Sequence, residues 1–501
     1  LVGAAMSRGA NVRVLGGDDA PDSRPRALLA RILGRDFDSI AFGSSREIDG
    51  LFDSAAPSQR AELAHALRRS NPVALGQAVA RCLSERGVPP GSVIERASLL
   101  RPRGIDFQSV FRAGTAKSGE GMSGVKTSKG RRKSLVVIGN GMVSYKLCEL
   151  LSEYDGGESF DVSVFCEEPR PAYDRVKLTS FFEKESADEL LLADANWYKE
   201  RKIRLLLGER AVRIDRGRRA VLSSSGEWVR FDNVVIASGS APFVPPIPGV
   251  QKQGVFVYRT IEDLVAIREY AKTAKVGAVL GGGLLGLEAA KAVHDLGLET
   301  HVIEFAPLLM PRQLDAAGGR LLAKTVEALG VKVHTSRSAT NILGGDKAEG
   351  LVFKDGETLE CDLIVVSAGI RPRDELARDA GLALGERGGI LVDDNLRTSD
   401  QDIFAIGECA LHQGMLYGLV APGYQMAEVC ARTLTGTEAK FAATDQSAKL
   451  KLLGTDVASF GDPFADQIGE KTISYEDMVK GVYKKLVVSA DRTKLVGGVL
   501  V

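Results

Sequence analysis

Residues 276–286 read Val276-Gly277-Ala278-Val279-Leu280-Gly281-Gly282-Gly283-Leu284-Leu285-Gly286. The first five residues have the length and apolar character of a buried strand, and helical spacing of apolar residues begins after the glycines. A strand that turns through glycines into a helix is typical of dinucleotide-binding folds, because bare backbone and a helix amino end together bind a pyrophosphate. The stretch therefore predicts an α/β nucleotide-binding domain.

An earlier stretch repeats this arrangement. The apolar strand Leu135-Val136-Val137-Ile138 leads into Gly139-Asn140-Gly141-Met142-Val143-Ser144 and a helix over 142–152. Ser144 stands where a third small residue lets helix and strand pack closely. One such motif is weak evidence. Two copies indicate a protein that holds two dinucleotides, and the natural pair is a flavin and a nicotinamide with hydride transfer between them.

Each glycine turn is followed by an acidic residue at the end of the next strand. In the first copy this is Glu167, after a strand over 161–166, with Glu168 as its close rival for the ribose hydroxyls. In the second copy it is Glu304, after a strand over 299–303. A carboxylate there favours the free 2′-hydroxyl of NAD and repels a 2′-phosphate, so we expect NADH in preference to NADPH.

Composition excludes several other classes of protein. Lys plus Arg and Asp plus Glu both number 65, so nothing points to nucleic acid or to an anionic membrane surface. We find no apolar run of the roughly 18 residues that span a bilayer and no secretory signal. The cysteines show no metal-ligand spacing, so we expect no metal site, no structural disulfide and a cytoplasmic protein. The six cysteines are Cys82, Cys148, Cys166, Cys361, Cys409 and Cys430.

The pattern along the chain predicts several parts. We expect two Rossmann-like dinucleotide-binding domains between an α/β amino-terminal segment and a small α+β carboxyl-terminal segment. Because the late strand Ile403-Phe404-Ala405-Ile406 resembles one that carries a flavin contact, the first domain is expected to resume after the second, which is then inserted in it. The expected boundaries are 1–100 for the amino-terminal segment, 101–133 for a flexible linker, 134–250 and 373–444 for the FAD-binding domain, 251–372 for the NAD-binding domain, and 445–501 for a carboxyl-terminal segment that ends as though truncated.

The amino-terminal segment has a soft resemblance of its own. Phe42-Gly43-Ser44-Ser45 at a strand end, and the later strand Val73-Ala74-Leu75-Gly76, resemble part of a uroporphyrinogen-III synthase. The likeness covers about half of such an enzyme, which needs two lobes around its cleft, so activity is not expected here. A generic α/β remnant remains an equal alternative.

Further segments resemble the two-dinucleotide flavoproteins. Residues 234–242 and 365–372 are similar to the two Ala-Thr-Gly turns of these proteins, residues 398–408 to their late flavin-binding loop, and Pro171-Ala172-Tyr173-Asp174-Arg175 to the loop that passes over the flavin. The resemblance implies FAD contacts from these segments and from the first glycine turn at Gly139, Gly141, Ser144, Glu167, Arg175, Ala237, Ser238, Gly239, Gly407 and Glu408. It implies NADH contacts at Gly281, Gly283, Gly286, Glu288, Glu304 and Gly369.

At two places the sequence differs from particular groups of these flavoproteins. Rubredoxin and ferredoxin reductases place a Lys a few residues after the loop Arg, whereas this chain has Ser180 there and Lys177 nearby. Disulfide reductases carry paired cysteines on the first helix, whereas Cys148 stands alone. A thiol relay is therefore not expected, and no side chain is assigned as a catalytic acid or base.

Longer stretches resemble one family more specifically. Residues 300–307, 418–424 and 447–454 are similar to the large subunit of NADH-dependent assimilatory nitrite reductase, and the likeness runs from about 134 to 501. It implies that FAD and NADH form the electron-input module. It also implies an iron–sulfur centre and a sirohaem domain only in a part that follows, with a small subunit and a homodimer as further partners.

The expected reaction is hydride transfer from NADH directly to the flavin. Glu288 matches a glutamate that touches the nicotinamide carboxamide in related reductases, although a plain helix-surface role is equally open. Two other functions share the same motifs. One is a stand-alone NADH:rubredoxin or ferredoxin reductase, and the other is a non-enzymatic flavin-containing NADH sensor or interaction module.

Overall fold

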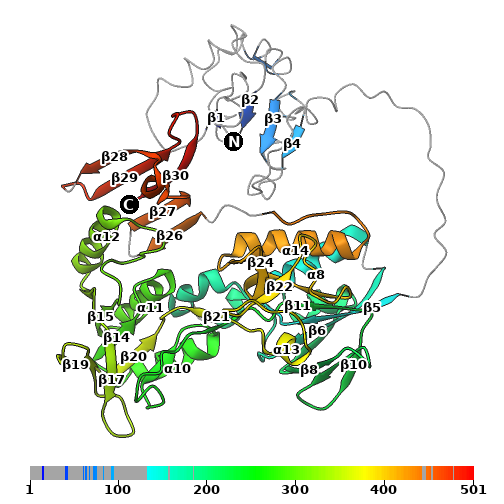
Figure 1. Ribbon diagram of the computed structural model, residues 1–501, viewed down its shortest axis with the longest axis horizontal. Coiled ribbons are helices and arrows are strands. Elements are labelled where there is room, and N and C mark those ends of the chain that lie inside the picture. The colour runs from blue at the N-terminus through cyan, green and yellow to red at the C-terminus, as the bar shows by residue number, and fades with distance from the viewer. Residues whose placement is uncertain are drawn as a thin grey trace. The chain divides into compact units, whose positions relative to one another are not determined.

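The computed structural model describes residues 132–501 except 156, 157, 184, 185, 443–446, 453, 454 and 478 (Figure 1). Before residue 132 it describes four short strands and the single positions 60, 63, 64, 67, 83 and 88. The chain divides into two compact units, Leu1–Ser128 and Lys129–Val501. Most of the predicted linker therefore lies outside the described residues.

The first unit contains a small parallel sheet. Its strands are β1 (Val14–Leu15), β2 (Ile40–Phe42), β3 (Pro72–Leu75) and β4 (Ser92–Ile94), in the order β1-β2-β3-β4. All three pairings are parallel, as the α/β rhythm of this segment predicts. The turn after Phe42 lies outside the described residues, so the likeness to a uroporphyrinogen-III synthase stays a prediction.

A five-stranded parallel sheet forms the first nucleotide-binding domain. Its order is β23-β11-β5-β6-β7, and the central strands are buried on both faces. Helices α8 and α14 pack against each other beside this sheet (Figure 1). The bounds are β5 (Lys133–Ile138), α8 (Met142–Asp155), β6 (Phe160–Cys166), β7 (Arg204–Leu207), β11 (Asn233–Ile236), β23 (Ile403–Ala405) and α14 (Val420–Leu434).

A second parallel sheet has the order β13-β20-β14-β15-β16. The chain enters it after β11 and returns to the first sheet at β23, where Val234 pairs with Ile403. The prediction that the second domain is inserted in the first is therefore confirmed. The bounds are β13 (Val255–Val257), α10 (Ile261–Ala271), β14 (Val276–Leu280), α11 (Leu284–Asp295), β15 (Glu299–Ile303), α12 (Ala316–Ala328), β16 (Lys332–His334) and β20 (Leu363–Val366).

Short elements connect and flank the two domains. A two-stranded antiparallel ribbon, β12 (Ser240–Pro242) with β21 (Ile370–Pro372), joins the chain leaving the first sheet to the chain leaving the second. The other strands are β8 (Ala211–Asp215), β9 (Ala220–Ser223), β10 (Trp228–Arg230), β17 (Ala339–Leu343), β18 (Gly350–Phe353), β19 (Thr358–Glu360), β22 (Ile390–Val392), β24 (Ala410–His412) and β25 (Met415–Leu416). The short helices are η3 (Arg175–Glu183), η4 (Ala187–Leu190), α9 (Ala195–Glu200), α13 (Glu375–Asp379) and η5 (Gly407–Cys409).

The carboxyl-terminal segment is a five-stranded antiparallel sheet with the order β26-β27-β30-β29-β28. One face packs on α12, where a Cβ added at Gly318 would lie 3.4 Å from each of Tyr483, Val499 and Val501. This face therefore shares its core with the second domain. The bounds are β26 (Ala448–Leu452), β27 (Thr455–Gly461), η6 (Ala465–Ile468), β28 (Lys471–Asp477), β29 (Val482–Val488) and β30 (Leu495–Leu500). No helix among the described residues is both long and apolar enough to cross a membrane.

Candidate functional site

The first glycine turn lies between β5 and α8. Gly139 has φ +102°, and a Cβ there would lie 2.4 Å from the carbonyl oxygen of Ala237, so the turn requires glycine. Ser144 is buried and donates a hydrogen bond of 2.9 Å to the carbonyl of Gly141. No atom lies within 4 Å of a Cβ added at Gly141, so the backbone there faces open space beside the helix amino end.

The second turn, between β14 and α11, has the same construction. Gly281 has φ +121°, and a Cβ there would lie 2.2 Å from the carbonyl oxygen of Ser367. A Cβ at Gly286 would lie 1.9 Å from the carbonyl oxygen of Gly281, whereas one at Gly283 would meet nothing within 4 Å. In both turns, therefore, one glycine is open between two packed positions, Gly139 and Ser144 in the first turn and Gly281 and Gly286 in the second, and that open backbone fits a pyrophosphate.

The β12–β21 ribbon brings the two Ala-Thr-Gly-like turns together. The backbone N–H of Arg373 donates to the carbonyl of Gly239 over 3.0 Å, and the Ser238 hydroxyl donates to the carbonyl of Arg373 over 2.7 Å. The N–H of Phe243 donates to the carbonyl of Gly369 over 2.8 Å. The loops that follow the two parallel sheets are thus fixed against each other by backbone hydrogen bonds.

The two acidic candidates of the first domain have different partners. Glu167 is paired with Arg373, whose Nη2 lies 2.6 Å from its Oε2, and its side chain is 44% exposed. Both oxygens of Glu168 are occupied by protein groups, since Tyr173 donates to one over 2.7 Å and Arg175 pairs with the other. Glu167 therefore has the more accessible carboxylate.

Arg175 is held between the two domains. Its Nη1 donates to the carbonyl of Arg259 over 2.8 Å, and its guanidinium lies 4.6 Å from the centre of the Tyr173 ring. Burial, more than the neighbouring charges, raises the pKa of Tyr173 well above its ordinary value. The loop that the sequence placed over the flavin is thereby fixed to the start of the second domain.

Glu408 lies in η5, directly after β23. Its Oε2 accepts a 2.7 Å hydrogen bond from the Ser240 hydroxyl and lies 2.5 Å from Nη2 of Arg259. The same Arg259 nitrogen donates to the Ser240 oxygen over 2.9 Å. The sequence analysis missed Arg259. The nearest feature in the sequence is the capping box of Thr260 and Asp263, which predicts where a helix begins. It gives no indication that Arg259 contacts a charged residue.

In the second domain, the side chain of Glu304 is hydrogen-bonded to the backbone of the glycine turn. Its Oε2 accepts from the N–H of Gly282 over 2.5 Å, and its Oε1 accepts from the N–H of Ala306 over 2.7 Å. The negative charge is therefore fixed beside the glycine turn. A nucleotide with a 2′-phosphate would bring a second negative charge to this position.

Glu288 lies on α11, one turn beyond the glycines. Burial raises the pKa of its carboxyl to about 7, and no charged or hydrogen-bonding group among the described residues contributes to that shift. Its charge contributes to the raised pKa of Tyr258, whose hydroxyl donates to the Thr179 hydroxyl over 3.2 Å. Glu288 therefore lies near Tyr258, which contacts the loop that carries Arg175.

The described cysteines are buried and unpaired. The Cys409 thiol donates weakly to the carbonyls of Ile236 and Ile406, and burial raises its pKa. Among the described residues, Cys148 has no cysteine partner for a thiol relay. No group of three or more metal-ligating side chains occurs in the described part of the chain. Cys82 lies outside the described residues.

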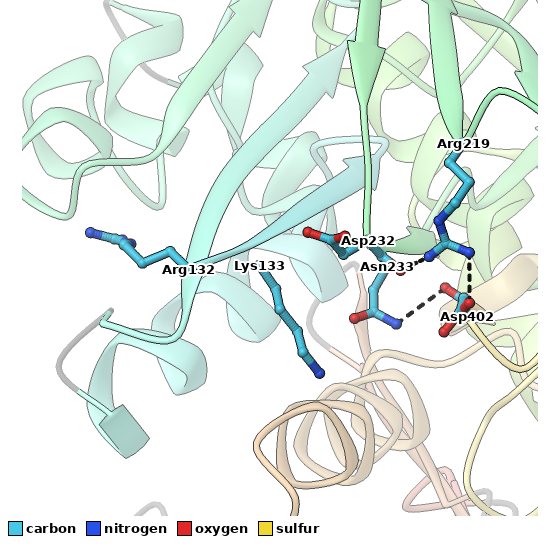
Figure 2. A pocket seen from close by; sticks show the side chains of 6 residues that line it. All are labelled: Arg132, Lys133, Arg219, Asp232, Asn233 and Asp402. Carbon is cyan, nitrogen blue, oxygen red and sulfur yellow. Dashed lines mark hydrogen bonds and ion pairs between the residues drawn. The ribbon is translucent and has the colours of Figure 1, made fainter. Parts of the chain in front are cut away.

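A separate pocket of about 300 Å³ lies at the opposite edge of the first sheet (Figure 2). Lys133 begins β5 and Asn233 begins β11, so the pocket is at the amino ends of these strands, whereas the glycine turn follows their carboxyl ends. Arg219 pairs with Asp402 across it over 2.8 Å. This pocket is therefore distinct from the nucleotide-binding edge.

Comparison with known proteins agrees with this geometry. The profile of the pyridine nucleotide-disulphide oxidoreductase family matches residues 133–432. The chain belongs to this family. Membership confirms the prediction of a flavoprotein oxidoreductase with FAD and NADH as its cofactors. It also agrees with the two glycine turns, each with one glycine left open.

Individual relatives extend the family assignment. The chain is 50% identical over 369 residues to the nitrite reductase (NADH) large subunit of Escherichia coli (strain K12), covering 73% of this chain and 44% of that protein. It is 37% identical over 372 residues to the assimilatory nitrate reductase electron transfer subunit of Bacillus subtilis (strain 168), covering 74% of this chain and 48% of that protein. The chain thus spans about half the length of these curated relatives.

Among solved structures, a ferredoxin reductase from Rhodopseudomonas palustris is similar to the chain at 26% identity with a TM-score of 0.67. The match covers 74% of this chain and 91% of that protein. The fold-class prediction of two dinucleotide-binding domains is therefore confirmed.

Proposed function

We propose that this chain is the electron-input part of an assimilatory nitrite reductase, in which NADH reduces FAD. The observation that carries the proposal is the pair of glycine turns, with Gly141 and Gly283 open to a pyrophosphate and the loops that follow the two sheets joined by the β12–β21 ribbon. The 50% sequence identity to a nitrite reductase large subunit over 369 residues supports nitrite reduction as the reaction that this part would supply with electrons.

The chain's own residues bind and orient the two cofactors. The first turn and the loops around Arg175, Ser238 and Glu408 hold FAD, with Glu167 toward a ribose. The second turn, Glu304 and Gly369 hold NADH, with Glu288 toward the nicotinamide. When bound, these cofactors exchange a hydride, and the protein's contribution is orientation and electrostatics. No side chain needs to act as an acid or a base.

Arg259 joins these two groups of residues. It holds Glu408 in the first domain through its side chain and accepts from Arg175 through its carbonyl. We therefore assign to it the positioning of the Glu408 carboxylate.

The proposed reaction of the complete enzyme requires domains other than the two nucleotide-binding domains. In the complete enzyme six electrons would convert nitrite to ammonia through an iron–sulfur centre and sirohaem, held in domains that follow this module. A small subunit and a second copy of the chain are further proposed partners, and we place the protein in the cytoplasm. This chain alone is expected to reduce artificial acceptors such as ferricyanide but not nitrite.

An anaerobic NADH titration of the purified, FAD-loaded chain tests the proposal. We expect the flavin absorbance near 450 nm, a property of the cofactor, to bleach with NADH and much more weakly with NADPH. Protein that binds no FAD would contradict the proposal. Slow bleaching with a persistent charge-transfer band would favour an NADH sensor instead.

The similarity to a ferredoxin reductase favours one alternative function, a stand-alone reductase of a small iron–sulfur protein. This alternative predicts rapid NADH-dependent reduction of added ferredoxin or rubredoxin by the chain alone. The nitrite reductase proposal predicts that reduction of these proteins is slow compared with ferricyanide.

A further inference from the structure

Strand β28 forms a free edge of the carboxyl-terminal sheet. It pairs with β29 on one side and has no partner strand among the described residues on the other. Every side chain from Lys471 to Glu476 is exposed, and Asp477 is half-buried. Exposed edge strands present unpaired N–H and C=O groups to which another strand can pair.

The centre of this edge is apolar. The side chains of Ile473 and Tyr475 are 62% and 54% exposed, and Leu486, opposite Ile473 on β29, is 36% exposed. Edge strands of monomers are usually protected by central charges, proline or a bulge. Ile473-Ser474-Tyr475 has none of these, so the edge is suited to a partner strand.

The sheet that carries this edge is fixed in place. On its opposite face Lys485 is 5% exposed and lies 3.3 Å from Asp315 and 2.9 Å from Asp466. Tyr483 donates to Asp315, the N-cap of α12, over 2.7 Å. The free edge is therefore presented by a sheet whose other face is anchored to the second domain.

The sequence of β28 is complementary to itself when read backwards. In an antiparallel pair centred on Ser474, Lys471 lies opposite Asp477, and Ile473 lies opposite Tyr475. Opposite charges and aliphatic–aromatic pairs are the cross-strand pairs that stabilise antiparallel sheets. Thr472 lies opposite Glu476, where its hydroxyl can donate. A two-fold axis through Ser474 repeats each of these pairs.

Other arrangements of the same strand are less complementary. Moving the centre to Ile473 places Glu470 opposite Glu476, and moving it to Tyr475 places Ile473 opposite Asp477. An in-register parallel pair would place each charge opposite its own copy. Like charges and an apolar residue opposite a carboxylate are unfavourable, so the Ser474 register is preferred.

We propose that β28 pairs antiparallel with β28 of a second copy of this chain, centred on Ser474, so that the carboxyl-terminal sheets of the two copies become continuous. This assigns a surface to the homodimer proposed above and does not depend on the cofactor assignments.

Opposite charges at Thr472, an exposed residue of β28 that pairs with Val487 of β29, test the proposal. In a two-fold dimer, Thr472→Lys places a lysine opposite Glu476 twice, and Thr472→Glu places two carboxylates together twice. We expect the dimer dissociation constant of the FAD-loaded chain, measured by analytical ultracentrifugation, to fall about fivefold for Thr472→Lys and to rise at least about fivefold for Thr472→Glu. Thr358, exposed on the edge strand β19, provides matched controls as Thr358→Lys and Thr358→Glu, which should leave the constant unchanged.

Circular dichroism and flavin content establish that each variant is folded, and NADH reduction of the flavin should be the same in all of them. A chain that stays monomeric at every accessible concentration would overturn the proposal. A dimer that responds equally to Lys and Glu at position 472 would also overturn it, because it would place the interface elsewhere. Loss of flavin reduction in the unsubstituted chain would refute the proposed function and leave the dimer measurement intact.

Discussion

The guanidinium of Arg259 lies 2.5 Å from the carboxylate of Glu408, although the two residues are 149 positions apart in the chain. Both side chains are largely buried, at 19% and 23% exposure. Arg259 follows the first strand of the second domain, and Glu408 follows the last strand of the first sheet. The pair therefore fixes the start of the inserted domain to the loop assigned to the flavin.

Removing this arginine should weaken FAD binding. In Arg259→Met the Glu408 carboxylate keeps Ser240 as a partner but loses its cation, so its position and charge are no longer fixed. A hydrogen bond to a charged group contributes about 1.5–3 kcal/mol, and we expect FAD affinity to fall at least about tenfold. Fluorescence of flavin released on dialysis measures this. Arg259→Lys should restore part of the affinity.

The matched control is Arg204→Met, which removes an exposed ion pair with Glu227 at the first sheet's edge. Exposed pairs contribute little, so FAD affinity should not change. Equal FAD affinity in Arg259→Met and the unsubstituted protein would refute the positioning role.

Two glycines of the second turn should respond differently to alanine. At Gly286 a Cβ would lie 1.9 Å from a backbone oxygen, so Gly286→Ala should destabilise the domain by about 3 kcal/mol or more. At Gly283 the space is open, so Gly283→Ala should fold with a loss of about 1 kcal/mol at the helix N-cap. Its methyl group would stand where we place the pyrophosphate, and NADH affinity should fall about tenfold.

Thermal unfolding separates these two effects from each other, and calorimetric titration with ADP-ribose measures nucleotide affinity without catalysis. If Gly283→Ala bound ADP-ribose as tightly as the unsubstituted chain, the pyrophosphate would lie elsewhere.

The sequence predicted more of the fold than of the candidate site. The glycine turns determine strand, turn and helix over a few adjacent residues, so the two nucleotide-binding domains followed from sequence pattern, whereas the insertion followed from the resemblance of the late strand to a flavin-binding one. Contacts such as Arg259 with Glu408 depend on how two domains pack, and no local spacing encodes that. The assigned residue roles, from Glu167 to Gly369, remain proposals, because the geometry constrains their surroundings without a bound cofactor.

The choice between NADH and NADPH should depend on Glu304. Its carboxylate is held by the N–H groups of Gly282 and Ala306, which fixes a negative charge beside the glycine turn. Glu304→Ala removes the repulsion of a 2′-phosphate and the acceptor for a ribose hydroxyl. We expect the ratio of kcat/KM for NADH to that for NADPH to fall about tenfold. Glu299→Ala, at the other end of β15, should leave the ratio unchanged, and an unchanged ratio in Glu304→Ala would assign specificity to another residue.

Glu288 should make stability depend on pH near neutrality. Burial raises its pKa from 4.5 to about 7, so the protonated carboxyl is favoured in the folded state. Its contribution to stability is fully present below pH 4.5 and is lost as the pH rises through about 7, by about 3 kcal/mol at most. Glu288→Gln is neutral throughout and should lose less stability than the unsubstituted chain between pH 5 and pH 8.5. Urea unfolding at both pH values measures the difference, with Glu327→Gln on the exposed side of α12 as control. Parallel loss of stability in the Glu288 variant and the unsubstituted chain would show that this carboxyl is already ionised at pH 5.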